Sequence, residues 1–138
     1  MKFIFVFLAI FTFSCIPPTW QECCDIQCDR MTKRRCKLTW AIDTMRKHRD
    51  AHVFAFYGGS GYGRGELMAW EEHDRVVETL KKLKSGYKIS KIEVDYSINW
   101  LKAAINTHNG KIKFRYENEI IHDYERVIGV LRENYEIL

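Results

Sequence analysis

Hydrophobic residues recur every three or four positions in several parts of this chain, which is the spacing of an amphipathic helix. Two long segments of this kind are residues 30–49 and 66–84, and a last helix is expected after Asn118, with a shorter one after Ser97. Ser85-Gly86 is a typical end for the second segment. The buried faces are expected to contain Met31, Leu38, Ala41, Ile42, Met45, Ala69, Val76, Leu80, Leu83, Ile98, Leu101, Ile105, Ile120, Ile121, Tyr124, Val127, Ile128 and Leu131.

Other segments have the pattern of β-strands. Residues 51–57 are apolar on both faces, as in a central strand. Residues 88–96 and 111–116 alternate apolar with charged side chains, which predicts half-exposed strands, and residues 135–138 are suited to a short edge strand.

The resulting order is strand, helix, strand, strand, helix, strand, which is that of the split β-α-β plait. We therefore expect an α+β fold of the ferredoxin-like type, with the basic helix attached to it by disulfides. The chain is expected to divide into a signal peptide at 1–14, a cysteine-rich basic segment at 15–50 and a core domain at 51–138.

Composition sets limits on the class of protein. The 138 residues are 46% hydrophobic and 29% charged, which is too apolar for an intrinsically disordered chain. The longest apolar run, Phe3 to Phe13, is shorter than the roughly 20 residues that a membrane-spanning helix needs. A polytopic membrane protein is therefore excluded.

The apolar run follows Met1-Lys2 and has the length of a secretory signal peptide. Small residues at Thr12 and Ser14 suit cleavage before Cys15, and a cysteine at that place is also where a bacterial lipoprotein carries its lipid. The alternatives are a buried first strand and a retained membrane anchor. The favoured interpretation is a protein that is secreted or anchored outside the cytoplasm.

Five cysteines lie in the first quarter of the chain. If Cys15 is removed or lipidated, four remain, and an even number in an exported domain indicates two disulfides. Adjacent cysteines rarely bond each other, so Cys23 and Cys24 are expected to pair separately with Cys28 and Cys36. Reduced thiols, and a metal site using Cys24, Cys28 and Cys36 with His48 or His52, are the alternatives; no metal is favoured.

Positive charge is concentrated in one segment. The chain has a formal net charge of +4, but residues 30–49 alone carry eight basic residues and one acid, a net charge of +7. Such a helix face either is simply solvated or docks something anionic. The candidate partner-binding residues are Arg30, Lys33, Arg34, Arg35, Lys37, Arg46, Lys47 and Arg49.

A glycine-rich loop at 58–65 precedes the second predicted helix. Backbone N–H groups in such a loop, with a helix N-terminus behind them, suit an anion. The candidate ligand-binding residues are Gly59, Ser60, Gly61, Gly63 and Arg64, although the spacing matches neither the P-loop nor the dinucleotide fingerprint, and a structural loop is the alternative.

Two functions follow from these features. The first is a small exported or membrane-tethered binding domain that docks an acidic protein surface, lipid head groups or a phosphate ligand through residues 30–49. The alternative is an enzyme acting on a phosphorylated or carboxylated small molecule at the glycine loop, with Arg64 holding the anion and His73 as weak candidate acid/base. No cofactor is indicated, and nucleic acid is disfavoured because exported, disulfide-bonded proteins seldom meet it.

Overall fold

The computed structural model describes residues 17–25, 30–57, 63–109 and 115–135, with side chains omitted at some helix ends. Every element in these ranges is a helix, and they contain no strand. The elements are α2 (Trp20–Asp25), α3 (Arg30–Tyr57), α4 (Gly63–Ser85), α5 (Lys91–Asn109) and α6 (Arg115–Tyr135). The expected α+β plait is therefore wrong, and the fold is a helical bundle.

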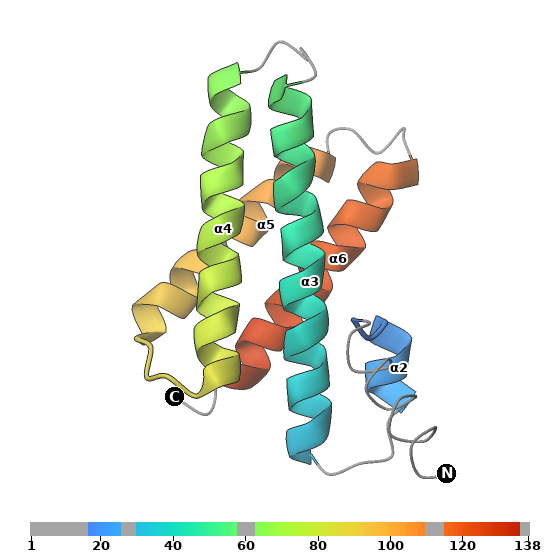
Figure 1. Cartoon of the computed structure of the whole chain (residues 1–138), viewed down its shortest axis with the longest axis vertical. Helices are drawn as coiled ribbons and strands as arrows, with labels where there is room; N and C mark the ends of the chain where they lie inside the picture. The colour runs from blue at the N-terminus through green and yellow to red at the C-terminus, as the bar shows by residue number, and fades with distance from the viewer. Residues whose placement is uncertain (1–16, 26–29, 58–62, 110–114, 136–138) are drawn as a thin grey trace, which may run out of the picture.

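The four long helices form two layers. Helices α3 and α4 run side by side in opposite directions, and α5 and α6 form a second antiparallel pair that crosses behind the first at an oblique angle (Figure 1). The short helix α2 packs on α3 and lies beside the half of α3 that comes first in the chain (Figure 1). One face of α3 is thus bordered by α4 on one side and by α2 on the other.

The hydrophobic core fills the space between the two layers. Each long helix contributes side chains that are almost inaccessible to solvent, as expected for apolar stripes facing one another. The most deeply buried include Leu38, Ala41, Met45, Val76, Val77, Leu80, Val94, Leu101, Tyr124, Val127 and Leu131.

Residues 51–57, predicted as a central strand, are the last two turns of α3. The helix continues through them because residues 30–57 contain neither glycine nor proline, the residues that most strongly disfavour a helix interior. It ends next to Gly58, at the start of the glycine-rich loop. One uninterrupted helix therefore carries both the basic segment and the first residues of the expected core domain.

Residues 88–96, predicted as a half-exposed strand, contain the start of α5. Ser90 caps this helix, because its side-chain oxygen accepts a hydrogen bond from the N–H of Glu93 at 3.3 Å. The residues that the alternation placed on one face separate in the helix: Val94 is fully buried, whereas Ile92 is 79% exposed. The strand predicted at 111–116 also fails where it is described, since residues 115 and 116 belong to α6.

The two long helices predicted at 30–49 and 66–84 are confirmed, as is the helix after Asn118, which starts slightly earlier. The end of α4 is also as expected. Gly86 has a φ of +76°, and the N–H of Tyr87 donates to the carbonyl of Lys82 at 3.1 Å, which is the pattern of a Schellman cap. This cap sets the direction in which the chain leaves α4 and starts toward α5.

One of the two expected disulfides is present. Cys23 in α2 is bonded to Cys36 in α3, and Cys23 is completely buried. Cys24 is an exposed free thiol, and Cys28 lies outside the described residues. The ring of Trp20 also packs on that of Trp40, with 4.7 Å between centroids. A helix of six residues is marginal by itself, so these contacts are what hold α2 on α3.

Candidate functional site

Half of the predicted basic residues make contacts within the molecule. Arg34 donates a hydrogen bond from Nε to the side-chain oxygen of the buried Asn134 in α6. Lys37 forms an ion pair with Glu133 at 3.2 Å and also lies over the ring of Trp20. These two cations therefore join α3 to α6 and α2.

Two further cations are paired near the middle of α3. Lys47 forms an ion pair with Asp43, one helical turn away, at 3.2 Å. Arg49 forms ion pairs with Asp50 at 3.0 Å and with Asp74 of α4 at 2.8 Å. The contact between Arg49 and Asp74 also fixes how α3 and α4 are aligned.

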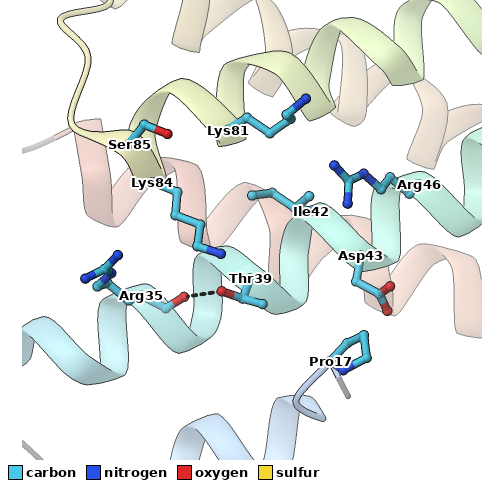
Figure 2. Close-up of a pocket in the computed structure, with 9 residues that line it drawn as sticks. All are labelled: Pro17, Arg35, Thr39, Ile42, Asp43, Arg46, Lys81, Lys84 and Ser85. Atoms are coloured by element: carbon cyan, nitrogen blue, oxygen red, sulfur yellow. Dashed lines mark hydrogen bonds between the residues drawn. The ribbon is translucent and has the colours of Figure 1, made fainter. Parts of the chain in front are cut away.

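Arg35 and Arg46 differ from these four cations. Both are exposed, and neither forms an ion pair with any carboxylate in the described part of the chain. Both line a cavity of about 370 Å³ between α3 and α4, together with Lys81 and Lys84 of α4 (Figure 2). Lys84 is also exposed and without an ion pair among these residues, while Lys81 pairs with Glu78 of its own helix.

We call this cavity the α3–α4 groove. Its lining residues are Pro17, Arg35, Thr39, Ile42, Asp43, Arg46, Lys81, Lys84 and Ser85. Four of these nine side chains are cationic and one, Asp43, is anionic and already paired. Because exposed cations with no internal partner keep their full attraction for an external anion, the groove is a favourable place for one.

Two further cavities adjoin the groove. One of about 310 Å³ shares Arg35, Lys84 and Ser85 with it. Another of about 540 Å³ shares Pro17 and Asp43 and extends toward Trp20 and Trp40. Pro17 lies three residues before the start of α2, which the Cys23–Cys36 disulfide fastens to α3, so this bond helps to keep one wall of the groove in place.

A second group of chemically active side chains lies between the layers, with His73 and Tyr124 buried and the others partly exposed. Four histidines from three helices surround the rings of Trp100 and Tyr124, and we call this group the histidine cluster. Its members are His48, His52, His73, His108, Trp100 and Tyr124.

His73 is the centre of the cluster and is only 2% exposed. Its Nδ1 lies 2.6 Å from the carbonyl oxygen of Ala69, which can only accept, so Nδ1 carries the proton. Its Nε2 then accepts from the hydroxyl of Tyr124, also at 2.6 Å. Burial lowers the pKa of His73 to about 3, the hydrogen bond to Ala69 partly opposes this, and the neighbouring histidines lower it further. His73 is therefore neutral at pH 7.

This environment bears on the alternative function. An acid/base must reach the substrate proton directly or through one water. His73 is buried, and both ring nitrogens are bonded inside the protein. His73 lines none of the three cavities described above. Its catalytic role therefore stays a prediction without support from the structure.

The glycine-loop site falls largely outside the described residues. Gly59, Ser60 and Gly61 are not described, and Gly63 and Arg64 are seen only as backbone in the first turn of α4. Arg30, at the start of α3, is also seen only as backbone. Cys15 and the expected signal segment lie outside the described residues. Lys33 is described and partly exposed. In the described ranges no three His, Cys, Asp or Glu side chains are arranged to hold a metal, and Cys36, a ligand of the alternative metal site, is disulfide-bonded.

Lys81 and Lys84 were not among the sequence candidates. They lie in the last turns of α4, a helix that carries five basic and five acidic residues in all. A signal did exist: two lysines three residues apart at a helix C-terminus lie on one side of that helix. What the sequence does not reveal is that this side faces Arg35 and Arg46.

Comparisons with known proteins add no name to this arrangement: no family model, no curated protein and no solved structure matches the chain. None of the helices described here combines the length and the apolar character needed to cross a membrane. The function must therefore be argued from the site itself.

Proposed function

We propose that this protein is a small exported binding domain that docks an anionic partner in the α3–α4 groove. The observation that carries the proposal is the set of exposed cations without internal ion pairs, Arg35, Arg46 and Lys84, which line one concave surface. Of the cations of the basic segment with described contacts, Arg34, Lys37 and Arg49 join α3 to other helices, and Lys47 pairs within α3. This distribution supports a surface that keeps its charge for an external ligand.

Export is supported by the Cys23–Cys36 disulfide, since such bonds persist mainly in oxidising compartments. It is also compatible with the signal-like sequence before Cys15. Whether the mature chain is free or tethered by that segment is part of the proposal and is decided by the mass of the protein isolated from its host.

The test compares two variants that lose the same number of charges. The first, Arg35→Gln/Arg46→Gln/Lys84→Gln, neutralises the groove. The matched control, Lys88→Gln/Lys102→Gln/Arg132→Gln, neutralises three exposed cations elsewhere that form no ion pair with the described residues. The probe is immobilised heparin, a sulfated polyanion, and the measured quantity is the salt concentration at which each protein elutes.

We expect the groove variant to elute at clearly lower salt than the control, because clustered cations bind a polyanion together whereas scattered ones do not. Circular dichroism of both variants checks that the helices are intact. Equal elution of the two variants would show that the groove has no special affinity for anions and would refute the proposed function.

A further inference from the structure

The cations of the groove lie at two separate places. Arg35 and Arg46 are eleven positions apart on α3, which corresponds to about 16 Å along the helix axis. This is much more than the width of one phosphate group. A ligand with a single anionic group can therefore use one end of the groove but not both.

Lys84 of α4 lies at the Arg35 end, and Lys81 precedes it by only three positions. Arg35 and Lys84 belong together, because both also line the neighbouring 310 Å³ cavity, which neither Arg46 nor Lys81 reaches. Figure 2 shows Lys84 directed toward Thr39 beside Arg35, with Arg46 on the other side of Ile42 and the amino group of Lys81 directed toward that side. The groove thus has an arginine–lysine pair at one end and Arg46 at the other, where the amino group of Lys81 is already paired with Glu78, and each end is suited to one phosphate or sulfate group.

The middle of the groove is not suited to an anion. Ile42 is apolar, and the hydroxyl of Thr39 already donates to the carbonyl of Arg35 at 2.9 Å. The carboxylate of Asp43 also lines the groove, and Lys47 is its only ion-pair partner among the described residues. A continuous polyanion can still bind the cations, but it brings negative charge close to Asp43, and an uncharged linker avoids this repulsion.

We infer that the ligand of the α3–α4 groove is a small molecule with two phosphate groups separated by an uncharged stretch. One phosphate lies between Arg35 and Lys84, the other on the guanidinium of Arg46, and the linker passes over Ile42. A cavity of about 370 Å³ is within the range of small-molecule sites. This inference rests on the proposed function and specifies which anion the groove prefers.

The experiment uses linear alkane bisphosphonates of increasing spacer length, with alkyl monophosphonates of the same lengths as matched probes. Titration calorimetry on the full mature chain measures the dissociation constant of each. One bisphosphonate length should bind about tenfold or more tighter than its monophosphonate, because the second group binds as an intramolecular event once the first is in place. Shorter spacers should lose this advantage.

Single variants locate the two phosphates. Arg35→Gln and Arg46→Gln should each reduce the affinity of the best bisphosphonate to about that of the monophosphonate, while Lys102→Gln, on the far layer, should leave it unchanged. If every bisphosphonate binds no tighter than its monophosphonate, the two-ended ligand is refuted, although a heparin difference between the two triple variants would still uphold the proposed function. If the triple variants also elute together, the proposed function fails as well.

Phospholipids are a second source of phosphate groups. Vesicles containing phosphatidylglycerol, with neutral phosphatidylcholine vesicles as control, show whether the groove binds a lipid surface instead. Binding to the anionic vesicles that the best bisphosphonate displaces would support the assignment. If the best bisphosphonate does not displace the vesicles, the phosphates belong to separate lipids, and the inference of a small-molecule ligand is wrong.

Discussion

The α3–α4 groove and the histidine cluster differ in how far their polar side chains are exposed and bonded within the protein. In the cluster, His73 is 2% exposed and both of its ring nitrogens are bonded to partners inside the protein. In the groove, Arg35 and Arg46 are exposed and form no internal ion pair with the described residues. From this difference we expect the cluster to stabilise the fold and the groove to contribute little to stability.

The largest expected effect is the loss of stability at acid pH through His73. Because its folded-state pKa is lowered to about 3 from 6.5, the folded protein prefers the neutral ring. The stabilisation is complete above pH 6.5 and is lost as the pH falls through 6.5 toward 3. Between pH 7 and pH 4 this amounts to about 3 kcal/mol.

Urea unfolding of the wild-type chain and of His73→Gln, at both pH values, measures this contribution. Carboxylates titrate in the same range in both proteins, so the difference between the two pH dependences isolates His73. The variant should be less stable at pH 7 but should lose about 3 kcal/mol less on acidification. Identical pH dependences would mean that His73 is not held neutral by burial, and the contrast with the groove would be lost.

The second effect concerns the wall of the groove. Closing a loop of 13 residues with the Cys23–Cys36 disulfide should stabilise the chain by about 2 to 3 kcal/mol on the loop-entropy model. Urea unfolding with and without reductant measures this, and Cys24→Ser is the control because Cys24 is exposed and unbonded. Heparin elution should also fall on reduction, since Pro17 would no longer be held against α3. Unchanged elution would mean that α2 does not shape the groove.

The smallest effect is expected for the groove cations. The variant Arg35→Gln/Arg46→Gln/Lys84→Gln should change the free energy of unfolding by less than about 0.5 kcal/mol, as is usual for surface substitutions without internal partners. Lys37→Gln should cost more, because Lys37 contacts both Glu133 and Trp20. A groove variant that is strongly destabilised would show that these cations are structural and would remove the basis of the comparison.

The helices could be predicted where their pattern was long enough to be unambiguous. Residues 88–96 were mistaken for a strand because Ile92, Val94 and Tyr96 alternate with charges over a short window. The sequence did contain the opposite evidence: Ser90 and Glu93 have the spacing of a capping box, and the structure uses Ser90 as the cap. The capping signal at Ser90 and Glu93 is stronger evidence for a helix than an alternation this short is for a strand.

The site could be predicted only in part. The sequence places Arg35 and Arg46 in a basic segment, but it does not show which cations of that segment are free. That depends on contacts between distant parts of the chain, such as the hydrogen bond from Arg34 to Asn134, 100 residues away. Lys84 joins the site only because α4 lies antiparallel to α3. The predicted α+β fold did not contain this pair of helices.

The most direct test of the central claim is an NMR titration of the isotope-labelled protein with an alkane bisphosphonate. Amide shifts should change on α3 around Arg35 and Arg46, and on α4 around Lys81 to Ser85. The amide shifts around His73 and along α5 should stay unchanged. Shifts centred on α5, on the histidine cluster, or spread evenly over the surface would contradict the claim that the α3–α4 groove is the binding site.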